Sequence, residues 1–313
     1  MSSFGDLNRV NTNIQSLDSQ LSLNRINRDL ANNQLRLSTG LRINRAEDDA
    51  AGYSIATKLN SRVAGLEQAL RNVGDAKSVL DIAESSFDTV MDNLIEMKAL
   101  STQAANDTLG EDERGYIGQQ IAKLAEDIND IANQTVFQDA QLLNGDPANT
   151  GGAAFSGSLS LTFQVGERSG DTLTASIDAV NISELFDLSG AGAPDNISIS
   201  TAGGQQGAFS FVNGATAATS ADFRSFIDAI DGAIGEMNDR VNEIGMTQSS
   251  LSIREVTLSQ SISANSAAAS RIMDADFAKE QSESIRLQIL QQTSTSALAQ
   301  ANMGPQSVLG FLG

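Results

Sequence analysis

The chain has 313 residues, and 39 acidic against 20 basic side chains give it a formal net charge of −19 at pH 7. This charge argues against nucleic acid and anionic membrane surfaces as partners, because their phosphate groups would repel it. Cysteine and histidine are both absent, which excludes disulfides, thiolate metal sites and any catalysis that needs a histidine base. The sequence contains no run of eighteen apolar residues, so it predicts no membrane-spanning helix. The first thirty residues also lack the apolar core of a secretory signal. Composition by itself therefore indicates a cytoplasmic protein.

The N-terminal stretch carries a helical seam, in which apolar residues alternate at spacings of three and four. The seam consists of Leu7, Val10, Ile14, Leu17 and Leu21. It then resumes in a shifted frame as Leu23, Ile26, Leu30 and Leu37. Arginines outnumber aspartates here, so the stretch is either a basic arm attracted to the acidic body of another copy or an ordinary solvated helix face.

A connecting segment is expected after this first helix, because Gly40 should end it and residues 41–52 (LRINRAEDDAAG) read as a loop. The dense opposite charges of the segment favour local ion pairs. Its spacing lacks the alternating oxygen ligands and the glycine of a calcium loop, so we expect no metal site there. The sequence likewise predicts no catalytic residue and no cofactor.

Residues 79–106 carry the cleanest heptad pattern, which predicts a helix with one buried face. That face comprises Leu80, Ala83, Phe87, Val90, Leu94, Met97, Ser101 and Ala104. A turn signal at 106–110 (NDTLG) precedes a second pattern, formed by Ile117, Ile121, Leu124, Ile128 and Ile131. Because the loop between the two helices is short, they should run antiparallel.

Between Pro147 and Pro194 the sequence becomes rich in Gly, Ser and Thr, and apolar residues alternate with polar ones. Residues 159–165 (LSLTFQV) and 172–177 (TLTASI) predict a hairpin of two strands around a tight loop. Residues 190–221 are expected to form short strands and loops.

The longest unbroken pattern covers residues 223–272, which contain no proline. The seam positions are Phe223, Ile227, Ile230, Ile234, Met237, Val241, Ile244, Gln248, Leu251, Glu255, Leu258, Ile262, Asn265, Ala269 and Ile272. One helix over this range would be roughly 75 Å long, which exceeds what a compact domain of this size holds. The pattern therefore predicts a rod, the alternative being a buried helix of an ordinary bundle. The three polar positions are of the kind that fixes register.

Residues 276–301 predict a further amphipathic helix, with Asp274 and Asp276 placed favourably at its N-terminus. Its apolar residues are Phe277, Ile285, Ile289, Leu290, Ala297 and Leu298. Gly304 and Pro305 are expected to end it. Since neither terminal seam has another partner in the chain, the two ends should pair with each other or with other copies. The predicted fold class is thus mainly α: long antiparallel heptad-patterned helices form a coiled-coil rod from N- and C-terminal parts, with a small β-hairpin and a short outer region of strands and loops.

Motifs at both ends of the chain resemble those of the bacterial flagellin family. The N-terminal motifs are residues 10–13 (VNTN), 35–44 (LRLSTGLRIN) and 48–52 (DDAAG). The C-terminal motifs are residues 274–278 (DADFA), 288–292 (QILQQ) and 298–302 (LAQAN). The resemblance covers about residues 9–180 and 222–313, and the joint match of both ends in this order is highly specific.

The resemblance implies three domains. A terminal coiled-coil domain lining an inner tube would consist of residues 1–44 with 274–313. A helical rod domain would consist of residues 45–178 with 222–273 and would carry a β-hairpin near 158–178. A short variable outer region would consist of residues 179–221. The implied assembly seam consists of Leu7, Val10, Ile14, Leu17, Leu21, Ile285, Ile289, Leu290 and Leu298.

The implied function is that of a structural subunit, not an enzyme, which self-assembles into the helical flagellar filament used for motility. The implied partners are other flagellin copies, filament cap and hook-associated proteins, an export chaperone and the type III export apparatus, but no nucleic acid and no membrane. The implied location is extracellular, reached without a cleaved signal peptide. One alternative is a hook-filament junction protein. A secreted enzyme is disfavoured, because an outer region of about forty residues without His or Cys offers little from which to build a site.

The resemblance also implies a surface that faces the host innate receptor for flagellin. The position where many members place an arginine is Glu96 here, a nearby glutamate position is Gln120, and Leu100 is retained. We therefore expect weak recognition, unless Lys98 on the same helix supplies the missing cation.

Overall fold

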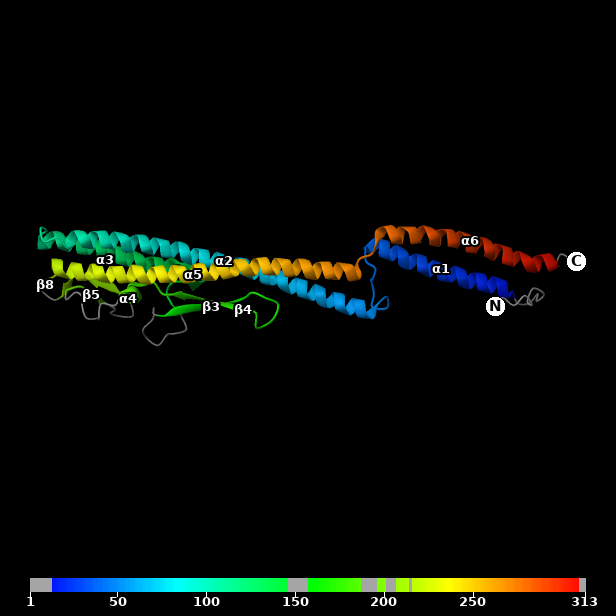
Figure 1. Cartoon of the computed structure of the whole chain (residues 1–313), viewed down its shortest axis with the longest axis horizontal. Coiled ribbons are helices and arrows are strands. Elements are labelled where there is room, and N and C mark those ends of the chain that lie inside the picture. Colours follow the sequence, from blue (N-terminus) through cyan, green and yellow to red (C-terminus); the bar gives the residue numbers. More distant parts are fainter. Residues whose placement is uncertain (1–12, 146–156, 187–195, 201–206, 214–215, 310–313) are drawn as a thin grey trace. The chain divides into compact units, whose positions relative to one another are not determined.

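The computed structural model describes residues 13–145, 157–186, 196–200, 207–213 and 216–309, and these are mainly helical (Figure 1). The helices are α1 (Ile14–Thr39), α2 (Ala50–Ala104), α3 (Glu111–Gln134), α4 (Ile182–Leu185), α5 (Ser220–Met273) and α6 (Phe277–Leu309). The strands form antiparallel pairs: β1 (Val136–Phe137) with β2 (Ala140–Gln141), β3 (Ser158–Gln164) with β4 (Thr172–Asp178), β5 (Ser198–Ser200) with β6 (Ala208–Ser210), and β7 (Val212–Asn213) with β8 (Thr216–Ala217). The predicted fold class is confirmed. Within the described ranges, no helix has the length and apolar character needed to cross a membrane.

The chain divides into two compact units, residues 1–64 with 262–313 and residues 65–261. The first unit combines the two ends of the chain, and the second is one continuous segment. Helices α2 and α5 contribute residues to both units. The three-domain division inferred from the family resemblance stays a prediction.

The core of the unit formed by residues 65–261 lies along α2, where the heptad prediction is confirmed. All eight residues of the predicted face, from Leu80 to Ala104, are fully buried. On α3, Ile117, Ile121 and Ile128 are buried as predicted, whereas the other two predicted positions are half-buried. The hydroxyl groups of Ser86 on α2 and Thr135 at the end of α3 lie 3.0 Å apart, far from the turn that joins the helices. This pairing places α2 and α3 antiparallel, as expected (Figure 1).

Helix α5 confirms the longest pattern of the sequence, since it runs without interruption from Ser220 to Met273. Buried side chains recur at every seventh position along it, namely Phe223, Ile230, Met237, Ile244, Leu251 and Leu258. A seven-residue repeat keeps one stripe of the helix directed at its partner over the whole length. Each of these large side chains contributes roughly 1.5 to 3 kcal/mol on full burial.

Two of the polar positions in the α5 seam face α2. The side-chain amide of Gln248 donates hydrogen bonds to Asp81 at 3.0 Å and to Glu84 at 2.7 Å. Glu255 forms an ion pair with Lys77 at 3.0 Å. Residue numbers therefore rise along α2 as they fall along α5, and these polar contacts fix the antiparallel register of the two helices.

Helix α2 begins at Ala50, well before residue 79, and the connecting segment is correspondingly shorter than the predicted 41–52. The side chain of Asp49 caps the helix, because its Oδ1 accepts hydrogen bonds from the backbone N–H groups of Ala51 at 3.1 Å and Gly52 at 3.0 Å. The first half of the helix buries mostly small side chains, which weaken the apolar periodicity. In the unit formed by residues 65–261 its buried residues are Leu66, Ala69, Val73 and Ala76, of which only Leu66 is large.

The predicted hairpin is confirmed as β3 and β4, which pair in register from Ser158↔Asp178 to Gln164↔Thr172. Its buried face includes Ile177, and Val165 beside the loop is buried as well. The side-chain amide of Asn72 on α2 donates a hydrogen bond to the backbone carbonyl of Gln164 at 3.1 Å. The hairpin is thus attached to the helical core by both apolar burial and a polar contact.

A cluster of five phenylalanines joins the outer strands to the helices, and nothing in the sequence pattern predicted it. The cluster consists of Phe186, Phe209, Phe211, Phe223 and Phe226. Neighbouring ring centroids lie 5.0 to 6.1 Å apart, in both stacked and edge-to-face arrangements. Such pairs contribute about 0.5 to 1.5 kcal/mol each beyond their area burial. The aromatic residues, scarce elsewhere, are concentrated where short strands must be held without a large sheet.

The start of α5 is tied to the same outer region through Asp222. Its Oδ2 accepts hydrogen bonds from the backbone N–H and the hydroxyl of Thr219, both at 2.7 Å, and from the amide of Asn196 at 3.0 Å. Burial alone would raise the pKa of Asp222, but the hydrogen bonds from Asn196 and Thr219 outweigh it and lower the pKa below its ordinary value. The buried carboxylate is therefore ionised and satisfied, and it both caps the helix and holds Asn196.

In the other unit, helices α1 and α6 pair with each other in an antiparallel arrangement (Figure 1). Helix α1 ends as predicted at Gly40, whose φ of 72° lies in the left-handed region that favours glycine. The predicted end of α6 is wrong: the helix continues through Gly304 and Pro305 to Leu309. The side-chain amide of Asn13, the residue before α1, donates a hydrogen bond to the carbonyl of Ala301, which lies four residues before Pro305.

Candidate assembly site

The pair formed by α1 and α6 has an inner seam with heptad spacing on both helices. On α1 this inner seam consists of Ser16, Ser19, Leu23, Ile26, Leu30, Asn33 and Leu37. On α6 it consists of Glu280, Ser284, Leu287, Gln291, Ser294, Leu298 and Ala301. About half of these positions are polar, so the inner seam buries much less apolar surface than the core along α2 and α5.

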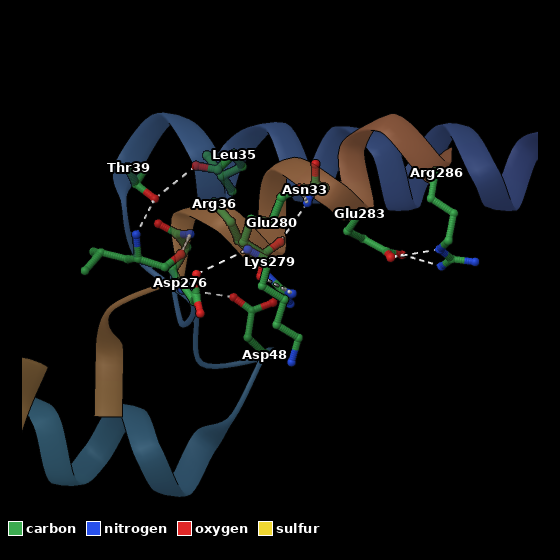
Figure 2. Close-up of polar contacts among 12 residues, drawn as sticks. Asn33, Leu35, Arg36, Thr39, Asp48, Asp276, Lys279, Glu280, Glu283 and Arg286 are labelled. Atoms are coloured by element: carbon green, nitrogen blue, oxygen red, sulfur yellow. Dashed lines mark hydrogen bonds and ion pairs between the residues drawn. The ribbon is translucent and has the colours of Figure 1, made fainter. Parts of the chain in front are cut away.

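Polar contacts set the register of this pair (Figure 2). The amide of Asn33, whose residue is only 4% exposed, donates hydrogen bonds to the side chain of Glu280 at 2.7 Å and to its backbone carbonyl at 3.0 Å. Glu280 also pairs with Arg36 at 3.8 Å. Further along, Gln291 donates a hydrogen bond to the amide oxygen of Asn27 at 2.8 Å. A polar residue in a heptad seam specifies register at some cost in stability.

A second row of apolar side chains on each helix lies outside the inner seam and is exposed. We call these the outer rows: Ile14, Leu17 and Leu21 on α1, and Phe277, Ile285, Ile289 and Leu290 on α6. Leu17 is 56% exposed and Ile289 is 59% exposed. The two frames seen in the N-terminal sequence are therefore two faces of one helix, because Leu23, Ile26, Leu30 and Leu37 face α6 while the earlier frame faces outward.

The structure places the predicted assembly residues on both faces. Ile14, Leu17, Leu21, Ile285, Ile289 and Leu290 lie in the outer rows, whereas Leu298 is half-buried on the inner seam. Leu7 and Val10 lie outside the described residues. The polar members of the inner seam on α6 were missed, because a search for apolar periodicity passes over serine and glutamine. The signal that pointed to this seam was the shifted apolar frame on α1.

Two short segments connect α1 and α6 to the long helices, and they pair with each other. Leu41 and Asp274 form an isolated antiparallel bridge. The N–H of Arg42 donates to the carbonyl of Met273 at 2.6 Å, and its guanidinium donates to the carbonyl of Ile272 at 2.7 Å. Arg42 therefore satisfies carbonyl groups at the C-terminal end of α5, where a cation also interacts favourably with the helix dipole.

The acidic residues of these segments act mainly as caps. Asp276 accepts hydrogen bonds from the N–H groups of Ala278 at 3.0 Å and Lys279 at 3.2 Å at the start of α6, as expected (Figure 2). The backbone N–H groups of Arg45 and Asn44 donate to Asp48, and they lower the pKa of its carboxyl below the ordinary value. Of the predicted local ion pairs, Arg45 with Glu47 is present at 3.1 Å.

The residues expected to face a host receptor lie on α2 and α3. Glu96 and Gln120 are exposed, and Leu100 is half-buried. Glu96 and Leu100 are four residues apart and so share one side of α2. Lys98 forms an ion pair with Asp231 on α5.

Comparison with known proteins agrees with these observations. The model of the bacterial flagellin N-terminal helical region matches residues 10–148, and that of the C-terminal helical region matches residues 227–312. The chain is 33% identical over 277 residues to a flagellin of Halalkalibacterium halodurans, which covers 88% of this chain and 89% of that protein. It is 34% identical over 324 residues to a flagellin of Bacillus subtilis, which covers 97% of this chain and 99% of that protein.

A solved structure is similar in fold. It is that of a putative flagellar hook-associated protein from Vibrio parahaemolyticus, with a TM-score of 0.56 and 16% sequence identity. The match covers 72% of this chain and 100% of the hook-associated protein, and at this identity it concerns the fold alone. Family membership is shown by the two matching family regions together with relatives that match nearly the whole chain. The chain belongs to the bacterial flagellin family.

Proposed function

We propose that this flagellin, a structural subunit of the flagellar filament, joins its neighbours mainly through the outer rows of α1 and α6. The observation that carries the proposal is the exposure of these large apolar side chains on helices whose inner seam is half polar. Apolar side chains gathered on a surface mark an interaction site. Each contributes roughly 1.5 to 3 kcal/mol when it becomes fully buried. Contacts between copies therefore provide the burial that the isolated pair lacks.

Charge supports the same arrangement. Helix α1 carries Arg25, Arg28 and Arg36 against Asp18 and Asp29, whereas the whole chain has a net charge of −19. A basic segment on an acidic protein is attracted to other copies and favours one orientation of approach over others. The attraction acts at long range, and the outer rows then provide the contact.

Family membership supports the remaining roles that we propose. The chain has no catalytic role, and its assembly partners are other flagellin copies, the filament cap and the hook-associated proteins. It is delivered by an export chaperone and the type III export apparatus to an extracellular filament. Residues 1–44 with 274–313 line the inner tube, residues 45–178 with 222–273 form the rod, and residues 179–221 form the outer surface.

Seeded growth tests the proposal. Purified monomer mixed with short fragments of its own filaments should elongate them, and negative-stain microscopy should record long fibres. The matched control is the same monomer without seeds, which should elongate much more slowly because nucleation brings several weakly paired ends together at once. Seeds that do not lengthen at any monomer concentration would contradict a filament subunit.

We further propose that Glu96, Leu100 and Gln120 form part of the surface presented to the host receptor, and that recognition is weak. Glu96→Arg should raise signalling in a receptor reporter assay by about tenfold, because a guanidinium replaces a carboxylate of opposite charge and restores a charge-assisted contact. Adding Gln120→Glu should raise it again. Lys98 forms an ion pair with Asp231, so we expect it to be a weaker source of this contact than an arginine at position 96.

The control for this experiment is Glu96→Gln, which removes the negative charge without supplying a guanidinium. Its potency should lie between those of the unmodified protein and Glu96→Arg. Full potency of the unmodified monomer would place the receptor surface elsewhere.

A further inference from the structure

Helix α6 has one interior carbonyl group for which the helix itself provides no donor. In an α-helix each carbonyl accepts a hydrogen bond from the N–H four residues further on. Four residues after Ala301 comes Pro305, which has no N–H, yet the helix continues to Leu309. Pro305 is the only proline of α6. The carbonyl of Ala301 is therefore unique among the interior carbonyls of this helix.

The missing donor comes from the other end of the chain. The side-chain amide of Asn13 donates a hydrogen bond to the carbonyl of Ala301 at 2.8 Å, although the two residues are 288 positions apart. Ala301 is buried, with 8% of its surface exposed, so an unsatisfied carbonyl there would be costly. One residue further on, the hydroxyl of Ser16 donates to the side chain of Asn302 at 2.8 Å.

Asn13 uses both ends of its amide. Its Oδ1 accepts a hydrogen bond from the N–H of Ser16 at 3.0 Å and so caps the start of α1. Its Nδ2 reaches across to α6. At the opposite end of the pair, the amide of Asn33 also donates to a backbone carbonyl, that of Glu280, although Ser284 four residues further on has an N–H. Two asparagine amides thus bind backbone carbonyls near the two ends of one antiparallel pair.

We propose that Asn13 is a positioning residue for filament assembly, which recognises the carbonyl freed by Pro305 and thereby fixes the register of α1 against α6. A heptad seam alone does not fix register, because a shift by seven residues places similar side chains opposite each other. This seam is especially permissive, since serines and glutamine alternate with its few large apolar residues. Along α6 only the carbonyl of Ala301 is an interior carbonyl without a donor in its own helix, so an amide that binds it selects a single register.

The inference rests on the proposed assembly through the terminal pair, and a double-mutant cycle tests it separately. Asn13→Ser keeps a good N-cap residue but is too short to reach Ala301. It should raise the critical concentration for polymerisation about tenfold, which corresponds to about 1.4 kcal/mol for an unsatisfied buried carbonyl. In a Pro305→Ala background, residue 305 regains its N–H, and the same Asn13→Ser change should then alter the critical concentration less than about threefold.

The outcomes separate the two proposals. If unmodified monomer does not extend seeds, the proposed function fails. If it extends them and Asn13→Ser has the same effect in both backgrounds, the proposed function stands and the role of Asn13 is overturned. An unchanged critical concentration after Asn13→Ser would overturn it equally.

A cross-linking measurement reads the register directly and remains informative if Pro305→Ala assembles poorly. The chain has no cysteine, so Ser16→Cys with Asn302→Cys introduces the only thiols, at positions whose side chains are in contact. In filaments a short thiol-specific cross-linker should join them within one chain in high yield. Adding Asn13→Ser should lower this yield several-fold, whereas Asn27→Ser, which removes a different contact between the helices, should leave it nearly unchanged. Equal yields with and without Asn13 would contradict the proposal.

Discussion

Brief proteolysis of the monomer should remove about residues 1–45 and 274–313, whereas the same digestion of filaments should leave both ends intact. The reason lies in the inner seam of α1 and α6, which is half polar and contains the buried Oδ1 of Asn33, an atom without a hydrogen-bond partner among the described residues. Ordering the backbone costs roughly 1 to 2 kcal/mol per residue, and most of the stability of a helix in a protein comes from the packing of its apolar face. Burial of the outer rows can offset this loss of backbone entropy only when another copy covers them.

The unit formed by residues 65–261 provides the internal control for this experiment. Its core along α2 and α5 is almost entirely apolar, with fully buried Leu80, Phe87, Phe223 and Met237. A fragment that contains this unit should therefore survive in both samples, and mass spectrometry should locate the cleavage sites outside it. Equal protection of the two ends in monomer and filament would contradict folding on assembly.

Leu298→Asp and Ile289→Asp should each prevent polymerisation while export continues, but for different reasons. Leu298 is half-buried on the inner seam against α1, so an aspartate there places an unpaired carboxylate between the paired helices, at a cost of several kcal/mol. Ile289 is 59% exposed in the outer row, so an aspartate there should leave the pairing of α1 and α6 intact and disrupt only the contact with a neighbouring copy. Because every subunit carries the change, either loss is repeated along the filament.

Two measurements distinguish these variants. Secreted protein in the culture medium reports export, and sedimentation after seeding reports polymerisation. Gln288→Glu is the matched control, because it adds the same charge at an exposed polar position next to Ile289. It should polymerise at nearly the unmodified critical concentration. Normal filaments from Ile289→Asp would show that the outer row of α6 is not an interface between copies. Normal filaments from Leu298→Asp would show that assembly does not depend on the inner seam between α1 and α6.

Local patterns in the sequence determined most of the fold. The seam from Phe223 to Ile272 predicted one long helix, and α5 matches it because a helix that buries one face must repeat apolar residues at its own period. The alternation in residues 159–165 predicted a strand for the corresponding reason. Gly40 ended α1 as predicted, because few other residues adopt its left-handed conformation. The motifs at the two ends identified the family.

Tertiary structure alone decided which apolar frame of α1 faces α6. The frame that contains Ile14 and Leu17 and the frame that contains Leu23 and Ile26 have the same spacing. Periodicity reports that a helix has an apolar face, but not whether that face meets its own chain or another copy. The facing seam of α6 is itself largely polar, so it gave no apolar signal.

The end of α6 shows the same limit. Proline normally ends or kinks a helix because it leaves a carbonyl without a donor, and this local rule predicted the end at Gly304 and Pro305. The donor that satisfies the carbonyl is Asn13, 288 residues away from Ala301. The phenylalanine cluster likewise gathers rings from separate segments of the chain. A sequence pattern shows which apolar faces must be buried and which backbone groups lack a local hydrogen-bond partner. The residues that bury those faces and bind those groups can come from distant segments, which meet only when the chain has folded.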